Sequence, residues 1–346
     1  MFQLKLLTPI LWLLALLLAG WTLAQLPLGT IMQSVTNLSV SQLILWLGLN
    51  LLIVLLCNYR WLRLNALVGQ HPGFLRLLLI RQAGQAVSFI TPGPQFGGEP
   101  LQVYWLYRLC GQPLGKTILA LGLDRFFELF INFSVLLLGL AIVLLYSQQN
   151  LTGWPELVGM LVLLIGLLFG IVWLLLRQPQ WMSNRLQRLA QRWHKHPRLL
   201  LLETGFQTMG ENLRVALSTQ KSVLLQALLL SLVSWGALLL ELDLVLGFAE
   251  IHADLPAFFL ILISMRLAIL VPLPGAVGTL ELSLLWAIQS LGYPAGAALG
   301  VIAMMRLRDV IVLGAGLLCL RLVQNRYRLS AATTDIGMLK DVGLPG

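Results

Sequence analysis

Two clusters of charged residues interrupt long apolar stretches of the sequence. Each fits within about one helical turn, and the members are Asp124, Arg125 and Glu128 in the first cluster and Arg306, Arg308 and Asp309 in the second. A charge at the centre of a membrane helix costs at least ~2.5 kcal/mol, so each of these side chains needs a partner or a function. Arg125 and Glu128 have the (i, i+3) spacing of neighbours on one helix face, as do the matching arginine and aspartate of the second cluster. The pattern fits arginines that receive an anionic head group with the acids as counter-ions, and it also fits a structural ion-pair network.

Two further acids each follow a break in apolar sequence. Glu99 and Glu281 begin the segment after the break, where a carboxylate can accept hydrogen bonds from free backbone N–H groups and favours the positive end of a helix. We expect this capping role first, and a proton-linked or cation-linked role is the alternative. Arg266 precedes the second break, and its candidate partners are Glu281, Glu241 and Asp243.

The breaks themselves are rich in proline and glycine and occur twice, at 89–99 (FITPGPQFGGE) and at 270–281 (LVPLPGAVGTLE). The residues that interrupt a helix there are Pro92, Gly93, Gly97 and Gly98 in the first stretch and Pro272, Pro274, Gly275 and Gly278 in the second. Broken backbone at membrane depth is tolerated only inside protein or beside a wet cavity, which is where transporters bind their substrates. Free amides near helix starts also bind phosphate-like anions. No lysine follows the glycines, so these are not nucleotide-binding loops.

The composition is that of an all-α polytopic membrane protein. Of the 346 residues, 58% are hydrophobic and 11% are charged, against about 25% charged in soluble domains. The net charge of +9 is best explained by Lys and Arg collecting on the cytoplasmic side, so we expect no nucleic-acid partner. The histidines and cysteines lack metal-ligand spacing, and we expect no metal and no cofactor.

Apolar runs and short arms predict the elements. Spanning helices are predicted at 6–26, 42–57, 117–146, 157–176, 222–248 and 295–323. A basic segment after the second of these carries Arg60, Arg63, Arg76 and Arg81. The short arms beside each break are too short to cross the membrane comfortably, so they predict two re-entrant hairpins, with arms at 74–90 and 100–109 and at 256–271 and 276–291. We expect the first hairpin to open to the cytoplasm and the second to open to the other face. The basic segment 177–221 fits an amphipathic helix on an anionic leaflet or a solvated loop. The alternation of basic and Lys/Arg-free connections predicts that both termini are cytoplasmic.

An internal repeat relates the two halves. Arg125 and Glu128 recur as Arg306 and Asp309 at one common offset, and the glutamates of the breaks recur at that offset with a slippage of one position. Each half holds three crossings and a hairpin, and an odd number of crossings inverts the second half relative to the first. We therefore predict a first repeat at 1–146 with its hairpin at 74–112, a second repeat at 147–323 with its hairpin at 256–291, and a cytoplasmic tail at 324–346.

The motifs of the breaks resemble one known family. Pro274, Gly275, Gly278 and Glu281 form a PGxxGxxE pattern, and the first break carries Pro92, Gly97, Gly98 and Glu99, followed by Asp124, Arg125 and Glu128. These residues resemble the transmembrane region of the lysylphosphatidylglycerol synthase family, also called UPF0104, over about 43–323. The chain departs from the family at Ala276, where a second glycine is usual, and at Gln102, where arginine is frequent. In full-length synthases the resemblance implies a flippase region for aminoacylated phospholipid fused to an aminoacyl transferase. Nothing in this sequence resembles that transferase.

We therefore expect a translocase of the bacterial inner membrane that moves an anionic or zwitterionic phospholipid or a glycolipid and is not an enzyme. The predicted head-group ligands are Arg125, Arg306 and Arg308, with Glu128, Asp124, Asp309, Glu99, Glu281 and Arg266 beside them. One alternative is an embedded lipid head-group transferase with Glu99, Glu281 or Asp124 as general base. Another is an accessory scaffold that holds a separate lipid-modifying enzyme on 177–221. A homo-oligomer is left open.

Overall fold

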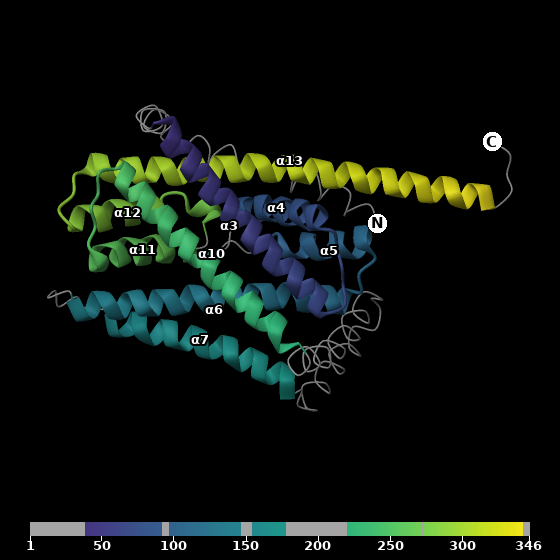
Figure 1. Ribbon diagram of the computed structural model, residues 1–346, viewed down its shortest axis with the longest axis horizontal. Helices are drawn as coiled ribbons and strands as arrows, with labels where there is room; N and C mark the ends of the chain where they lie inside the picture. The colour runs from purple at the N-terminus through teal and green to yellow at the C-terminus, as the bar shows by residue number, and fades with distance from the viewer. Residues whose placement is uncertain (1–38, 92–96, 147–153, 178–219, 272, 342–346) are drawn as a thin grey trace.

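The computed structural model describes residues 39–91, 97–146, 154–177, 220–271 and 273–341, and this part of the chain is helical without strands (Figure 1). The elements are α3 (Val40–Leu67), α4 (Phe74–Ile90), α5 (Glu99–Cys110), α6 (Leu114–Tyr146), α7 (Trp154–Arg177), α10 (Lys221–Phe248), α11 (Leu255–Leu270), the short 3-10 helix η1 (Pro274–Ala276), α12 (Thr279–Ser290) and α13 (Ala295–Asp341). The all-α prediction is confirmed for this part. The helix predicted at 6–26 and nearly all of the basic segment 177–221 lie outside the described residues.

Three of these helices, α3, α6 and α10, are long and apolar enough to cross a membrane, with mean hydropathy of 2.3, 2.5 and 2.2 in their most apolar windows. Two shorter apolar helices, Val158–Ile171 within α7 and the whole of α11, accompany them. Large apolar side chains on the outer helices are exposed, among them Ile44 and Leu51 of α3 and Leu163 of α7. Extensive apolar exposure of this kind suits contact with lipid and confirms a membrane protein.

Local sequence signals set several helix boundaries. Ser39 caps α3 through a capping box with Gln42, each side chain bonding the backbone N–H of the other residue. Asp254 caps α11 by accepting a hydrogen bond from the N–H of Ala257. Gly111 ends α5 in the left-handed conformation, with φ of 62°, which glycine adopts without strain. The short helices α5 and α11 are thereby joined to their long neighbours by compact turns.

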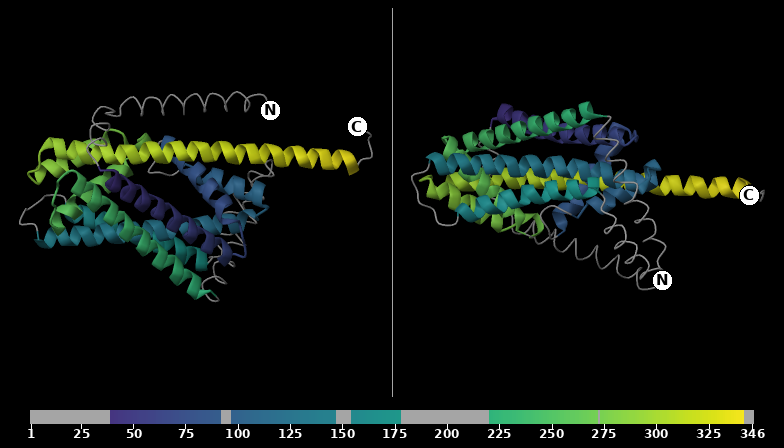
Figure 2. Two further views of the ribbon diagram at one scale, coloured as in Figure 1. Left: turned by 45° about the horizontal axis from the view of Figure 1, so that its top comes forward. Right: turned by 90° about the horizontal axis from the view of Figure 1, so that it is seen from below.

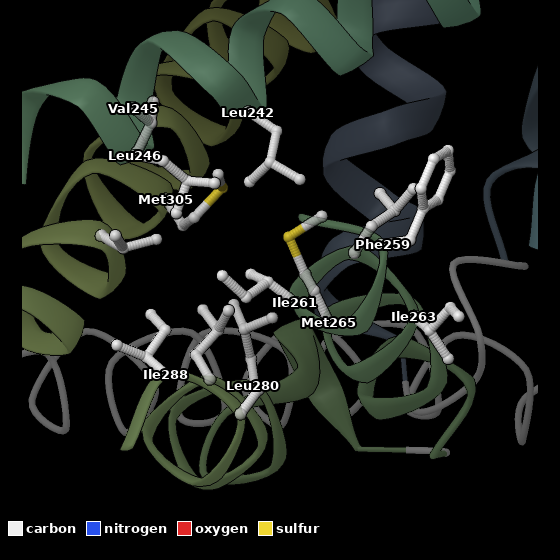
Figure 3. Packing of buried hydrophobic residues seen from close by; sticks show 14 of the residues in the cluster. Leu242, Val245, Leu246, Phe259, Ile261, Ile263, Met265, Leu280, Ile288 and Met305 are labelled. Carbon is white, nitrogen blue, oxygen red and sulfur yellow. The ribbon is translucent and has the colours of Figure 1, made fainter. Parts of the chain in front are cut away.

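The short helices pack against long helices that are distant in the sequence. The helix α4 lies along α13, α11 lies along α6, and α3 lies along α10 (Figure 1). The largest buried cluster joins α6 to α10, α11, α12 and α13 and includes Leu242, Val245, Ile261, Met265, Leu280 and Met305 (Figure 3). The helix α13 extends past the other helices at its C-terminal end (Figures 1 and 2).

The starts of the elements recur at a nearly fixed offset. The helices α3, α4 and α6 begin at positions 40, 74 and 114, and α10, α11 and α13 begin at 221, 255 and 295, so the offset is the same for all three pairs. The starts of α5 and α12, at 99 and 279, depart from it by a single position. The offset found for the charged residues is therefore also the offset of the helices that carry them.

Two predicted boundaries are wrong. The helix α3 is predicted to end at Cys57, but it continues to Leu67, so Arg60 and Arg63 belong to the helix and not to a basic connection. The helix α13 is predicted to end at Val323, but it continues to Asp341, and no proline interrupts its hydrogen bonds over that length.

Candidate functional site

The first charged cluster is organised around Asp124, which is fully buried on α6. Its carboxylate forms ion pairs with Arg60 Nε of α3 at 2.7 Å and with Arg81 Nη1 of α4 at 2.9 Å. Arg60 also donates a hydrogen bond to the hydroxyl of Ser231 on α10. Glu128 lies at the edge of the same cluster, 3.6 Å and 3.9 Å from the two arginines. One carboxylate therefore joins three helices, and the charges within the cluster are mutually compensated.

Both arginines that bind Asp124 were not predicted as site residues. Arg60 and Arg81 were expected in a basic segment, yet both are almost completely buried. The internal repeat could have indicated one of them. Arg60 and Glu241 are both buried charged residues, and they are separated by the same offset as the two charged clusters. Charged residues that recur at the repeat offset are expected to lie at equivalent buried positions.

Arg125 connects α6 to the start of α5. Its Nη2 atom lies 2.9 Å from Glu99 Oε1, and its Nη1 atom donates to Glu128 at 2.9 Å. The other oxygen of Glu99 accepts the N–H of Gly97 at 2.8 Å. Glu99 thus bonds the backbone of the break, as its capping role requires, and it is held there by an arginine of the neighbouring long helix.

Arg306 repeats this arrangement in the second half. Its Nε atom donates to Glu281 at 2.7 Å, and its Nη1 atom donates to Asp309 at 2.8 Å. The other oxygen of Glu281 accepts the N–H of Gly278 at 2.8 Å. A unit of glutamate, arginine and glycine amide therefore occurs in both halves with the same connectivity.

Arg306 additionally holds the turn η1. Its guanidinium donates to the carbonyl oxygens of Gly275 at 2.9 Å and Ala276 at 3.2 Å. Both turn residues have positive φ, 59° and 50°, so their carbonyls have left the helical hydrogen-bond pattern and need other donors. The arginine side chain is 1% exposed, and most of its N–H groups are used. This geometry favours the structural alternative for Arg306 over direct contact with a ligand.

Glycines make the first pair of short helices pack closely. A Cβ atom on Gly98 would clash with the carbonyl oxygen of Gly84 on α4, and the Gly98 N–H donates to Ser88 at 2.9 Å. Gly278, in contrast, is required for its φ of 86°, and nothing lies close to its missing side chain. Pro92, Gly93 and Pro272 lie outside the described residues, as does the side chain of Pro274.

Two arginines near the second turn are less constrained. Arg308 has a side chain that is 26% exposed, and it donates to Glu241 at 3.2 Å. The other oxygen of Glu241 accepts from the indole N–H of Trp46 on α3 at 3.0 Å. Arg266 forms no ion pair with any residue that the structure describes, and its buried Nε–H lacks a hydrogen-bond acceptor. It stacks over the ring of Trp235 at 4.7 Å, and it forms no ion pair with any of its three predicted acidic partners.

A small cavity lies where the end of α4 meets the second turn. It has a volume of about 30 Å³, and its lining includes Ser88, Phe89, Gly275, Ala276, Arg308 and Asp309. The ring of Phe89 covers Gly275 so closely that a Cβ atom there would lie 2.7 Å from the ring. A cavity of this size holds a water molecule or two, so a larger ligand requires the two breaks to separate.

Arg125 and Arg306 occupy equivalent positions on their long helices. Arg125 is the twelfth residue of α6 and Arg306 is the twelfth residue of α13. Eleven residues of helix rise roughly 16 Å, so each arginine lies well inside its helix. In the described part of the chain no three His, Cys, Asp or Glu side chains gather as a metal site would require.

Comparison with known proteins identifies the family of this chain. It matches the family model described as the lysylphosphatidylglycerol synthase TM region over residues 9–316. It is 28% identical to a UPF0104 membrane protein of Methanothermobacter thermautotrophicus over 137 residues, which cover 40% of this chain and only 38% of that relative. No solved structure matches it significantly. Because the family model covers most of the chain, the resemblance of the proline- and glycine-rich motifs is confirmed, and this protein belongs to the family of the lysylphosphatidylglycerol synthase transmembrane region.

Proposed function

We propose that this protein is a lipid translocase of the bacterial inner membrane, which moves a phospholipid or glycolipid between the leaflets without changing it chemically. The observation that carries the proposal is the unpaired Arg266 of α11 together with the partly open Arg308, which lines the cavity at the contact between the two helix breaks. Arg266 forms no ion pair with a described residue, a cation without a counter-ion is costly in a membrane, and an anionic head group would compensate it.

The internal symmetry supports alternating access. A short helix of each half packs on a long helix of the other half. The helix α4 of the first half packs on α13 of the second, and α11 of the second half packs on α6 of the first. This is the pattern that two inverted repeats with re-entrant hairpins would produce. The ion pairs of Arg125 and Arg306 would keep the start of α5 on α6 and the start of α12 on α13 during such a motion.

The head-group route would run between the two breaks. In this proposal the phosphate is bound by Arg266 and Arg308, and the contact of Phe89 with Gly275 opens to admit it. The acyl chains stay in lipid. Arg125 and Arg306, first expected to be ligands, brace the hairpins because their donors bond carboxylates and turn carbonyls.

Charge at the ends of the bundle supports the proposed orientation. The ends of α3 and α5 and the starts of α4, α6 and α10 lie together at one end of the molecule (Figure 1). The basic residues at these helix ends are Arg63, Arg108, Arg76, Lys116 and Lys221, in the same order. The connection between α10 and α11, at the opposite end, carries Glu250 and Asp254 and no Lys or Arg. The basic end would face the cytoplasm, and both termini with it.

Reconstitution tests the proposal. Wild type and Arg308→Gln would be placed in proteoliposomes with acyl-labelled phospholipids and a labelled lipid-linked sugar. We expect wild type to move at least one lipid and Arg308→Gln to lose at least about tenfold in rate. Arg321→Gln, an exposed arginine further along α13, is the matched control and should behave as wild type. If folded wild type moves no lipid, the proposal is wrong.

The transferase alternative has less support. Asp124 is bound by two arginines, and Glu99 and Glu281 each bond an arginine and a backbone amide. A general base needs an oxygen that can reach a substrate proton, and the oxygens of these acids are taken up by arginine and backbone donors. A covalently altered lipid in cells that overproduce the protein would support the transferase instead.

A further inference from the structure

We infer that Arg266 alternates between two positions, over the ring of Trp235 as in this structure and against the carboxylate of Glu128 on α6, and that Glu128 and the lipid phosphate compete for it. This inference rests on the proposed function, because the phosphate is the ligand that exchanges with Glu128. The observation that carries it is that Arg266 forms no ion pair with a described residue, while an acid with a partly exposed side chain lies within its reach.

Glu241, one of the two acids near Arg266, has no room for it. Glu241 and Glu128 both lie within electrostatic range of Arg266. The side chain of Glu241 is 2% exposed, its Oε1 atom accepts from Trp46, and its Oε2 atom accepts from Arg308. Both of its oxygens are therefore engaged within the packed core, and Glu128 is the acid that can take up a second position of Arg266.

Glu128 is the most accessible of the charged side chains that form ion pairs in the described part of the chain. It is 39% exposed, and the others are 26% exposed or less. The closest approach of each neighbouring arginine is to the same oxygen, Oε2: Arg125 at 2.9 Å, Arg60 at 3.6 Å and Arg81 at 3.9 Å. A carboxylate accepts hydrogen bonds at both oxygens, so Oε1 is left for a further donor.

The packing of α11 on α6 brings Arg266 towards Glu128. The two helices run antiparallel, since α6 begins at the basic end of the molecule and α11 begins at the opposite end (Figure 1). Their register is set where the ring of Phe259 lies so close to Gly139 that a Cβ atom there would clash with it.

The register places the two charges on facing sides of their helices. Arg266 follows Phe259 by seven residues, which return to the same helix face after a rise of roughly 10 Å. Glu128 precedes Gly139 by eleven residues, which also return to the same face after roughly 16 Å. The positions therefore differ by about 6 Å along the helices, a separation that an extended arginine side chain can span.

The exchange would give the translocase a step that resets it. While Arg266 and Arg308 hold the phosphate, the guanidinium of Arg266 stays over Trp235. When the phosphate leaves, Glu128 takes the guanidinium and ties α11 of the second half to α6 of the first half. This ion pair must break before the next head group binds. Because it forms in one state alone, it favours that state by its own free energy.

The test follows Trp235 by fluorine NMR in protein labelled with 5-fluorotryptophan. Loss of the signal in Trp235→Phe assigns it, and Arg266→Gln gives its position for a ring without the cation. In wild type we expect signals for the covered and the uncovered ring, or their average. Phosphatidic acid, which carries a bare phosphate, should shift the population towards the covered ring, and diacylglycerol, which lacks the phosphate, should not.

Variants of Glu128 provide the second arm. Glu128→Gln should reduce the population of the uncovered ring at least about tenfold, because the amide does not attract the guanidinium. A merely structural role of Glu128 would not move Arg266 onto Trp235. Asp243→Asn is the matched control, since Asp243 is an exposed acid on α10, and it should leave the populations unchanged.

The outcomes separate this inference from the proposed function. Wild type that moves no acyl-labelled lipid in proteoliposomes contradicts translocation itself. Wild type that moves lipid while its Trp235 signal responds to neither phosphatidic acid nor Glu128→Gln leaves translocation standing and overturns the inference. If Glu128→Gln does not fold, Glu128→Asp decides. It keeps the charge beside the three arginines and draws the carboxylate back from α11, so it should also reduce the uncovered population, and unchanged populations would overturn the inference.

Discussion

The two charged regions share a common unit and differ in everything around it. In both, a glutamate at the start of a short helix bonds a glycine amide and an arginine of the next long helix: Glu99 with Arg125, and Glu281 with Arg306. Around the first unit, Asp124 gathers Arg60 and Arg81 and leaves the charges compensated. Around the second, Arg266 has no acidic partner among the described residues and Arg308 is partly open.

The shared unit is therefore the brace, and we propose that the difference marks the binding site. A brace is needed wherever backbone is broken at membrane depth, because the freed amides and carbonyls must be bonded inside the protein. An uncompensated cation is needed only where a ligand supplies the missing charge. On this view the first region holds the fold, and the second holds the fold and the substrate.

The largest effect is expected at the central carboxylate of the first region. Asp124→Ala leaves Arg60 and Arg81 buried without their acid, and removal of one partner from a buried ion pair costs about 3–5 kcal/mol. Asp309→Ala in the second region should cost about 1–2 kcal/mol, because Arg306 retains Glu281 and two carbonyls. Unfolding free energies in mixed micelles measure both. Equal losses would remove the contrast between the regions.

The two braces should differ in the same assay. Arg306→Gln removes bonds to two carboxylates and two turn carbonyls, and we expect a loss of about 3 kcal/mol. Arg125→Gln removes bonds to two carboxylates alone, and we expect about half of that loss. A larger loss for Arg125→Gln would mean that the turn carbonyls at Gly275 and Ala276 do not depend on Arg306.

The glycines of the two breaks should be required for different physical reasons. Gly98→Ala forces a Cβ atom against the backbone of Gly84, and overpacking against backbone costs about 1–3 kcal/mol, with this site at the upper end. Gly278→Ala meets no neighbour and carries only the strain of φ at 86° and ψ at −49°, about 1–3 kcal/mol. Thermal melting of the purified variants checks the order. Gly278→Ala melting below Gly98→Ala would contradict it.

The smallest effect on stability is expected at the cation of the second region. Arg266→Gln removes stacking on Trp235 and also removes an uncompensated buried charge, so the two changes offset each other to within about 1 kcal/mol. The same melting assay measures this. A loss as large as that of Arg306→Gln would show that Arg266 is another brace and not a ligand-binding residue.

Part of this architecture could be predicted from the sequence. The (i, i+3) pairs Arg125–Glu128 and Arg306–Asp309 form as predicted, since both partners lie on one helix and their spacing fixes their proximity. The bonds from Glu99 and Glu281 to glycine amides also form as the capping role predicts. The common offset between the halves was visible in the charges and is also the offset of the helix starts.

The rest depends on tertiary contacts that periodicity does not encode. Basic residues near the end of an apolar run usually lie on the cytoplasmic side, and only the packing of α3 and α4 on α6 buries Arg60 and Arg81 instead. Trp46 and Glu241 are far apart in the sequence and meet only because α3 lies along α10. Arg266 was expected to find an acid, and its stacking on Trp235 left no signal in the sequence.

The central claim is that the second region binds the lipid head group through Arg266, an arginine that forms no ion pair with the residues that the structure describes. The rate of lipid movement by Arg266→Gln in proteoliposomes, with Arg321→Gln as the matched control and the melting temperature of each measured in parallel, tests this most directly. We predict that Arg266→Gln melts near wild type and moves lipid at least about tenfold more slowly, while the control keeps the wild-type rate. A folded Arg266→Gln that moves lipid at the wild-type rate would contradict the account.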